Sequence, residues 1–263
     1  RRPPRSTLLP YTTLFRSISF APGDYLLAKP ILLDGRDRHL VLDGGGLATL
    51  NGGVQLSGWR RDGARLRSRV PDGVEPRLLV VAGTSRERAR FPAEGTLANR
   101  NQPVDLRWQS STKGGWNRPL THEERTRMLV NPGDIPAGMD LSNAEITVYH
   151  QWDESTVRVK SYDPDSGLVE FWTETEHPPG AFNSQRYTIW NTREGMTRPG
   201  QWYFDRAYGE VVYWPEPGEE PETLDAWIAV AEHAILCHGC RDVEIRGFQI
   251  RFCSAPEIGR AHV

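Results

Sequence analysis

The side chains best suited to catalytic or binding chemistry gather in one short run, His150-Gln151-Trp152-Asp153-Glu154. Hydrolysis of a glycosidic bond uses two carboxyl groups, about 5–5.5 Å apart in retaining enzymes and about 6.5–9.5 Å apart in inverting ones. Asp153 and Glu154 are adjacent, and neighbouring side chains on a strand point to opposite faces. They therefore cannot form such a pair. We predict that the run lies at the solvated end of a hairpin, where His150 and Trp152 could contact a substrate.

A second group of candidates precedes another hairpin, and it consists of Asn191 and Glu194. Glu194 could contact a substrate or cap its loop by a hydrogen bond, and the sequence leaves both interpretations open. Several tryptophans could stack on the apolar C–H face of a sugar ring or could be buried in a core. These are Trp108, Trp116, Trp152 and Trp190.

The cysteines suggest a metal or redox site only weakly. Cys237 and Cys240 have the C-x-x-C spacing of such sites, and Cys253 is the third cysteine. A closed zinc site needs four ligands, and no second pair of cysteines follows in the sequence. We therefore expect a turn between two strands with incidental thiols. We predict no metal and no cofactor.

The charge balance argues against a polyanionic partner. The chain has 32 basic and 34 acidic residues. Binding of phosphates needs clustered Lys and Arg, so we predict no nucleic-acid partner. The short basic run Arg86, Arg88 and Arg90 alternates as one face of a strand would, and we expect that face to be solvated. The sequence has no apolar run of about 18 residues, which predicts no membrane span.

Composition and turn signals predict a mainly β protein, because the chain has 25 Gly, 20 Pro and 9 Trp. Pro199 to Pro215 reads as a hairpin closed by Asp205 and Gly209. A second hairpin joins 157–162 to 168–172, and alternation places Val157, Val159 and Ser161 on one face of it. One short helix is predicted over 121–129, where Thr121 and Glu124 form a capping box.

The lengths of the predicted strands and the positions of turn residues divide the sequence into three blocks. Short strands separated by Asp34-Gly35 and Gly44-Gly45-Gly46 fill 18–58, and similar short strands return over 223–254. Their spacing of about 20–25 residues is typical of the coils of a parallel β-helix. The longer strands of 59–222 predict an antiparallel β domain inserted between the two blocks.

Both ends resemble a translated sequencing adapter. Leu14–Ser17 and Glu257–Arg260 can be encoded by reverse-complementary nucleotides. We therefore expect residues 1–17 and 255–263 to be artefacts of sequence assembly, and the chain to be an internal fragment. Those two segments are excluded from the fold prediction.

Several motifs in a fixed order resemble glycoside hydrolase-like proteins with a right-handed parallel β-helix, of the pectin lyase-like type. The order runs from Ala-Pro-Gly-x-Tyr through Trp-x-x-Ser and Asn-x-x-Glu to Pro-Gly-x-Trp-Tyr-x-Asp. Here these motifs are Ala21–Tyr25, Trp152–Ser155, Asn191–Glu194 and Pro199–Asp205.

The resemblance covers nearly all of 18–254. It implies the start of a β-helix interrupted by an inserted domain, in an extracellular or periplasmic protein that acts on a polysaccharide or oligosaccharide. It also implies that the catalytic carboxylates lie on later coils, beyond the end of this chain.

Three functions stay open for the intact protein: a polysaccharide-degrading glycoside hydrolase, a polysaccharide lyase, and a non-catalytic glycan-binding or adhesive β-helix protein. Fold does not decide among them. For the chain alone we expect an unprotected apolar edge with Ile245, Phe248 and Ile250, a tendency to aggregate, and no hydrolysis.

Overall fold

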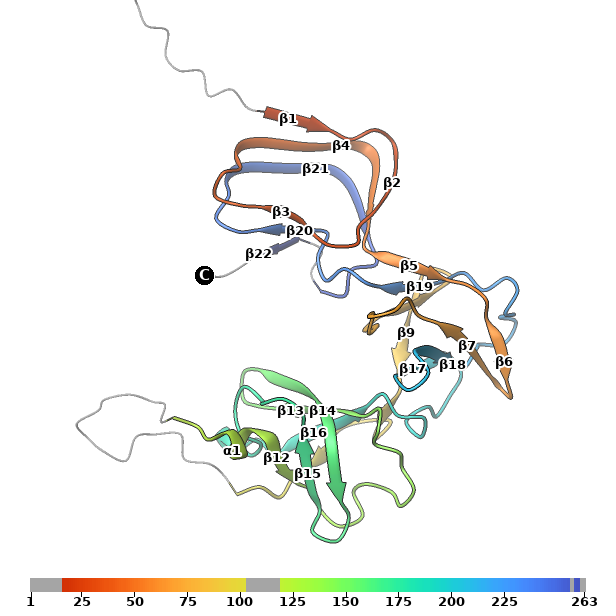
Figure 1. Ribbon diagram of the computed structural model, residues 1–263, viewed down its shortest axis with the longest axis vertical. Coiled ribbons are helices and arrows are strands. Elements are labelled where there is room, and N and C mark those ends of the chain that lie inside the picture. Colours follow the sequence, from red (N-terminus) through yellow and green to blue (C-terminus); the bar gives the residue numbers. More distant parts are fainter. Residues whose placement is uncertain (1–15, 103–118, 256–257, 261–263) are drawn as a thin grey trace, which may run out of the picture. The chain divides into compact units, whose positions relative to one another are not determined.

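The computed structural model describes residues 16–102, 119–255 and 258–260 (Figure 1). The fold is mainly β, as predicted. The chain divides into two compact units. Unit 1 comprises residues 1–55, 76–80 and 226–263, and unit 2 comprises 56–75 and 81–225.

Parallel strand pairs dominate unit 1. The long strands β4 and β21 lie side by side in parallel, with Leu40 opposite Val243 and Leu50 opposite Ile250 (Figure 1). β1 and β2 also pair with β4 in parallel, and β20 pairs in parallel with β3 and β22. The strands β5, β19 and β8 are neighbours in that order. The bounds are β1 (Arg16–Ser19), β2 (Gly23–Leu26), β3 (Ile31–Leu33), β4 (Arg38–Asn51), β5 (Gly53–Leu56), β8 (Leu79–Val81), β19 (Ala226–Ala229), β20 (Ile235–Cys237), β21 (Arg241–Arg251) and β22 (Ile258–Arg260).

The end segments set aside in the sequence analysis are partly described. Arg16 and Ser17 belong to β1, where they pair with Leu40 and Val41. Ile258–Arg260 forms β22 beside β20. The rest of 1–17, and residues 256–257 and 261–263, lie outside the described residues.

Glycines bend the strands of unit 1 without interrupting them, which corrects the predicted break at Gly44-Gly45-Gly46. Gly45 and Gly46 have φ of 59° and 76°, and Gly247 in the neighbouring strand has φ of 69°. A Cβ on Gly247 would lie 2.9 Å from the backbone nitrogens of both Gly45 and Gly46. Glycine is therefore needed twice here, for its left-handed backbone and for the close approach of two chains.

The core of unit 1 is unevenly enclosed. Side chains of β3 and β4 are buried, among them Leu33, Leu40, Leu42 and Leu50. The facing residues of β21 pack on this cluster but are only partly buried; they are Val243, Ile245, Phe248 and Ile250. The predicted apolar row thus lies on β21, where its side chains are partly buried against the cluster rather than unprotected.

The first sheet of unit 2 runs in the order β9-β17-β18-β7-β6. Its centre is the predicted hairpin of β17 and β18, which pairs Trp202 with Tyr213 and Asp205 with Glu210. Gly209 closes the turn with φ of 62°, so this prediction is confirmed. The bounds are β6 (Arg60–Asp62), β7 (Arg65–Arg69), β9 (Thr84–Arg88), β17 (Gln201–Asp205) and β18 (Glu210–Tyr213).

The second sheet of unit 2 runs in the order β10-β16-β13-β14-β15-β12, with β11 also paired to β16. Its inner face carries a fully buried core that includes Met128, Ile146, Val148, Val169, Tyr187 and Ile189. The bounds are β10 (Arg90–Phe91), β11 (Leu97–Ala98), β12 (Arg127–Leu129), β13 (Glu145–Tyr149), β14 (Glu154–Asp163), β15 (Leu168–Phe171) and β16 (Arg186–Trp190). A 3-10 turn, η1, spans Ala181–Asn183.

A β-bulge corrects the predicted alternation in the hairpin of β14 and β15. Val159 pairs with Phe171, but Ser161 pairs with Glu170, so one extra residue lies between them. A bulge reverses the faces of all following residues. Val157 and Val159 are buried as predicted, whereas Ser161 is exposed and Tyr162 packs against the core.

The predicted helix is shorter than expected. α1 spans His122–Thr126, with Thr121 as N-cap and the capping box with Glu124 complete. The prediction of the cap is confirmed, but Arg127–Leu129 forms β12 and pairs with β15. Sheet pairing of Met128, which is fully buried, outweighs the helical signal there.

The arginines of β9 are not a solvated face, which corrects a further prediction. Arg88 Nη1 lies 2.7 Å from the carboxylate of Glu145, whose side chain is only 1% exposed. Arg206, in the turn after β17, also binds Glu145. Arg86 pairs with Glu219 at 2.5 Å. The two pairs with Glu145 tie β9 and the β17–β18 turn to β13, and the pair with Glu219 ties β9 to the segment after β18.

Candidate functional site

The hairpin loop between β13 and β14 presents the first candidate residues. His150 N donates to Asp153 O at 2.9 Å, which closes the loop as the sequence predicted. The prediction of a solvated hairpin end holds for Trp152, which is 77% exposed at the tip, but is wrong for His150, which is buried at 2% exposure. The loop therefore buries an imidazole and displays an indole within three residues.

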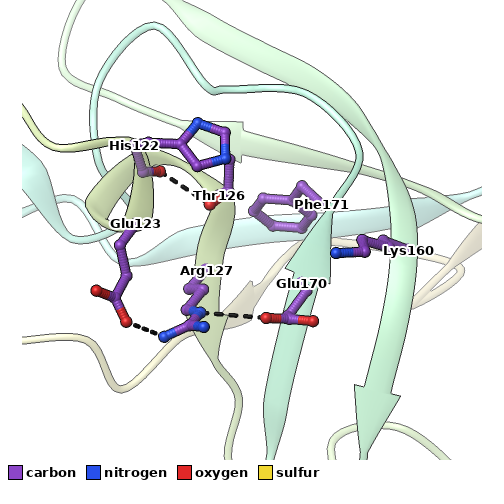
Figure 2. Close-up of a pocket in the computed structure, with 7 residues that line it drawn as sticks. All are labelled: His122, Glu123, Thr126, Arg127, Lys160, Glu170 and Phe171. Atoms are coloured by element: carbon purple, nitrogen blue, oxygen red, sulfur yellow. Dashed lines mark hydrogen bonds and ion pairs between the residues drawn. The ribbon is translucent and has the colours of Figure 1, made fainter.

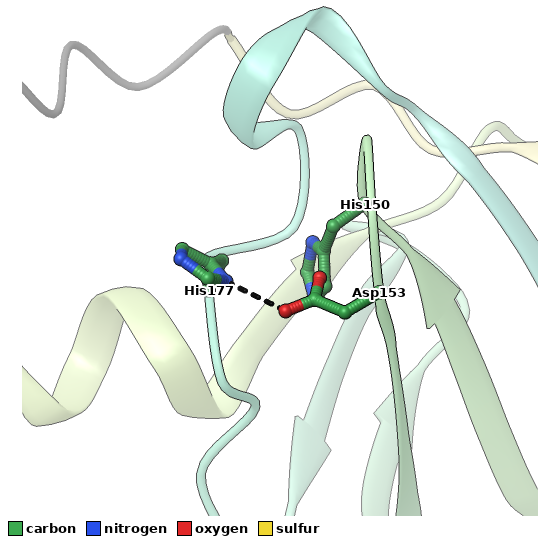
Figure 3. Close-up of side chains that lie close together, drawn as sticks. All are labelled: His150, Asp153 and His177. Carbon is green, nitrogen blue, oxygen red and sulfur yellow. Dashed lines mark ion pairs between the residues drawn. The ribbon is translucent and has the colours of Figure 1, made fainter.

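A second segment of unit 2 brings His177 to this loop. Its Nδ1 lies 3.4 Å from Asp153 Oδ2, and its ring centroid lies 5.4 Å from that of His150. Figure 3 shows His150, Asp153 and His177 facing one another. One ring nitrogen of each histidine and one oxygen of Asp153 all lie within 4.8 Å of one another.

Burial lowers the pKa of one member of this cluster, His150. Desolvation lowers the pKa of His150 below its usual value, and the negative charge of Asp153 opposes that effect only in part. A lowered pKa keeps the imidazole neutral at neutral pH. His150 Nε2 lies 3.3 Å from Ser155 Oγ, which also accepts the backbone N–H of Glu176 at 2.8 Å.

Aromatic rings surround the cluster. Phe182 packs edge-on against both Trp152 and His177, with centroid distances of 5.0 and 4.9 Å. Trp152 thus has one edge supported while its side chain stays largely exposed. An exposed, supported indole can stack on the apolar face of a sugar ring.

The other tryptophans named from the sequence are placed differently. Trp190 donates from Nε1 to Thr147 Oγ1 at 2.9 Å, and the guanidinium of Arg90 lies over its ring. Both partners belong to the same sheet as Trp190, so this side chain is held by contacts within that sheet. Trp108 and Trp116 lie outside the described residues.

The register of the sheet separates the two predicted groups. β13 pairs antiparallel with β16, with Glu145 opposite Trp190 and Val148 opposite Tyr187. His150 follows one end of this strand pair, and Asn191 follows the other. The structure therefore brings His150 and Trp152 together but does not unite them with Asn191 and Glu194.

Asn191 occupies a buried position. Its Nδ2 donates to the backbone oxygens of Asn143 and Phe204, and its Oδ1 accepts the N–H of Phe204 at 2.8 Å. These bonds fix β17 against the segment before β13. Its role as a substrate contact stays a prediction.

Glu194 is exposed and lines a cavity of about 380 Å³. Two further carboxylates, Asp140 and Asp205, line the same cavity, together with Arg67 and the exposed ring of Tyr208. Arg67 Nη1 lies 3.2 Å from Asp205, so part of this charge is paired. The cavity could admit a polar ligand, and contact of Glu194 with a substrate stays a prediction.

A second hollow in unit 2, of about 260 Å³, is lined by α1 and the β14–β15 hairpin. Figure 2 shows Arg127 between Glu123 and Glu170, and it forms ion pairs with both. His122 in turn lies 2.8 Å from Glu174. These opposite charges neutralise one another, so the hollow offers little to attract a charged ligand.

The cysteines of unit 1 are free thiols. Burial, followed by a hydrogen bond with Cys240, raises the pKa of Cys237 to about 11. The thiolate is the form that binds metals and reacts, so a protonated Cys237 suits neither task at neutral pH.

Sequence reasoning found His150 and Trp152 but missed His177. His177 lies 27 positions after His150 in a segment without strand periodicity, and no spacing rule links the two. Only the tertiary fold brings them together.

Comparisons with known proteins give one likeness of fold. No family model matches the chain, and no curated protein matches it. A solved structure described as "Glycoside hydrolase" is similar, with a TM-score of 0.57 at 20% sequence identity. The match covers 84% of this chain and 39% of that one, so the chain corresponds to well under half of its neighbour. Among the described residues, no helix is long and apolar enough to cross a membrane.

Proposed function

We propose that this chain is part of a carbohydrate-active protein, a polysaccharide-degrading glycoside hydrolase built on a right-handed parallel β-helix. The observation that carries the proposal is the likeness of fold to a glycoside hydrolase over 84% of the chain. The ordered motifs from Ala21–Tyr25 to Pro199–Asp205 support it independently. An extracellular or periplasmic location follows from the same resemblance and is part of the proposal.

Unit 1 supplies the β-helix in this proposal, and residues 59–222 are an inserted antiparallel domain. Strands of 226–251 stack in parallel on strands of 31–51, with β21 on β4 and β20 on β3. Such stacking of one chain segment on another is how successive coils of a β-helix pair.

The catalytic carboxylates are proposed to lie on coils outside these 263 residues. Neighbouring parallel strands are about 4.8 Å apart, so carboxylates on consecutive coils would lie near the distance that retaining glycosidases use. The structural neighbour is long enough for such coils, because the match covers only 39% of it.

The experiment that tests this proposal starts from the full reading frame around this sequence. The complete protein would be incubated with a panel of plant and bacterial polysaccharides. Release of new reducing ends without an unsaturated product is the expected result. Unsaturated uronic products would identify a lyase instead, and binding without cleavage would identify a glycan-binding protein; either result overturns the hydrolase proposal.

Unit 2 is proposed to contact the glycan through Trp152. Replacing Trp152 by Ala should weaken retention on the cognate polysaccharide by about 2- to 10-fold, the effect of losing one aromatic stacking contact. Trp172→Ala is the matched control, since Trp172 is also exposed but lies near Lys160 rather than in the loop. Equal retention of the two variants would argue against a role for Trp152.

A further inference from the structure

The cluster of His150, Asp153 and His177 has the donors of a metal site. The three residues present two imidazole rings and one carboxylate, with one donor atom from each within 4.8 Å of the others. We propose that they bind a divalent transition-metal ion, zinc by the nature of the donors. This proposal concerns unit 2 alone and does not depend on the glycan-related function.

The geometry is close to that of a bound ion. Zinc lies about 2.0–2.1 Å from histidine nitrogens and about 2.0–2.2 Å from carboxylate oxygens, which puts two ligands of a tetrahedral site about 3.4 Å apart. His177 Nδ1 and Asp153 Oδ2 already lie 3.4 Å apart. Asp153 is exposed and His177 only half-buried, so both can move the short way toward the buried ring of His150.

Unpartnered nitrogens provide a second, independent observation. Within the described part of the chain, Nδ1 of His150 is a buried atom without a hydrogen-bond partner, and Nδ1 of His177, also buried, has no hydrogen bond but lies 3.4 Å from Asp153 Oδ2. His150 as a whole is 2% exposed. Buried polar atoms are normally satisfied, and an unsatisfied one calls for an explanation such as an ion. A metal would bind the lone pair of His150 Nδ1 that the protein leaves unused, and it could replace the contact between His177 and Asp153.

The other ring nitrogen of His150 has a fixed acceptor nearby. Metal-bound histidines usually donate their other N–H to a fixed acceptor. Ser155 Oγ, held by the N–H of Glu176, lies 3.3 Å from His150 Nε2 and can accept that bond when Nδ1 is the ligand.

The pair of His122 and Glu174 serves as a comparison, because it is an ion pair without the features of a metal site. His122 Nδ1 lies 2.8 Å from Glu174, but the guanidinium of Arg125 also binds Glu174. A neighbouring cation disfavours a metal ion. No Arg or Lys is paired with Asp153 in the part of the chain that the structure describes.

Metal binding would join two segments that are otherwise separate in the sequence. His150 and Asp153 flank Trp152 in the β13–β14 loop, and His177 belongs to the segment before η1. An ion shared by all three would fix the loop that displays Trp152. Three protein ligands also leave a fourth position for water or another oxygen ligand.

The test measures zinc binding by the whole 263-residue chain after treatment with a chelator. We expect one zinc per chain in calorimetry and a higher melting temperature in zinc than in chelator. Asp153→Asn and His177→Gln should each weaken binding at least 10-fold, as loss of ligand-shell groups does. His122→Gln is the matched control and should bind as the unchanged chain does. Circular dichroism checks that each variant is folded.

Cobalt distinguishes this site from the cysteines. Cobalt bound to two imidazoles and a carboxylate should give weak visible bands without the intense near-ultraviolet band of cobalt–thiolate bonds. A thiolate band that disappears in a Cys237→Ser, Cys240→Ser variant would overturn the proposal. The proposal would also be overturned if the Asp153 and His177 variants bound zinc as tightly as the unchanged chain. It would be overturned too if the unchanged, chelator-treated chain bound no zinc in calorimetry.

Discussion

Units 1 and 2 bury their apolar side chains in different ways. In unit 2 the residues on the inner face of β13, β15 and β16 are fully enclosed, and Ile146, Val169 and Tyr187 are all 0% exposed. In unit 1 the equivalent residues of β21, such as Ile245 and Phe248, are only partly buried on the cluster around Leu42. An antiparallel hairpin sheet completes its core with nearby segments, whereas a stack of parallel coils buries each coil against the next. We therefore expect unit 2 to be the more stable of the two.

The largest effect should come from the buried carboxylate of unit 2. Glu145→Gln removes the charge that pairs with Arg88 and Arg206 and leaves two guanidinium groups without it. Breaking a buried ion pair in this way costs about 3–5 kcal/mol of unfolding free energy. Urea unfolding of the chain measures it. Glu123→Gln, at an exposed pair with Arg127, should cost less than about 1 kcal/mol. Similar losses in both variants would contradict this reasoning.

The cores themselves can be compared by one truncation in each. Ile146→Ala in unit 2 should cost about 2–5 kcal/mol, because a cavity remains at a fully buried site. Ile245→Ala in unit 1 should cost about 1 kcal/mol, since that side chain is only partly buried. Hydrogen exchange of the amides in each unit gives the two values separately. If Ile245→Ala costs as much as Ile146→Ala, the two cores do not differ as described.

Glycine substitutions sharpen the comparison further. Gly209→Ala in the β17–β18 turn meets nothing within 4 Å, so it should cost only the about 1–2 kcal/mol of a left-handed backbone. Gly247→Ala in unit 1 adds a clash with the backbones of Gly45 and Gly46, worth about 1–3 kcal/mol more. Thermal unfolding of the two variants measures the difference. Equal costs would mean that the two strands of unit 1 are not packed this closely.

The smallest effect is the response to alkaline pH. Burial raises the pKa of Cys237 in unit 1 to about 11, from an ordinary value of about 8.5. Burial, reinforced by Asp134, raises the pKa of Tyr187 in unit 2 well above its ordinary value of about 10. When the pKa of a group is higher in the folded state than in the unfolded state, the free energy of unfolding is highest below the unfolded-state pKa. It falls as pH rises above that value, because the unfolded chain loses the proton first. Destabilisation should therefore begin above about pH 8.5 in unit 1 and above about pH 10 in unit 2.

Hydrogen exchange across this pH range follows each unit, with Cys237→Ser and Tyr187→Phe as controls that should flatten the response of their own unit only. A unit 1 response that is unchanged by Cys237→Ser would exclude the thiol as its cause.

Local signals predicted the parts of this fold that local interactions determine. The hairpin turn closed by Gly209 and the capping box of Thr121 and Glu124 were both evident from residue types alone. The bulge between Val159 and Ser161 was not, because nothing in the residue types there marks an inserted position. The continuity of β4 through Gly45 was also missed, since glycine signals a turn, whereas β4 pairs with β1, β2 and β21 on either side of that position.

Some residues of the candidate site were likewise evident from the sequence, and others were placed only by tertiary packing. His150 and Trp152 stood out because they neighbour Asp153 in the sequence. His177 did not, since its proximity depends on the packing of a segment without regular structure. The burial of Asn191 was equally hidden, because the same amide that could bind a substrate binds backbone groups of Asn143 and Phe204.

The bulge in β14 has a consequence for how this sequence can vary in length. Lys160 is the residue without a partner, between Val159 opposite Phe171 and Ser161 opposite Glu170. Deleting Lys160 would restore regular pairing while Val159 and Tyr162 stay on the core face and Ser161 stays outside. This hairpin can therefore lose one residue at a single position without moving any other side chain to the wrong face. A deletion earlier in β14, within Thr156–Val159, would not be tolerated in the same way, because it would shift the buried valines to the solvent side.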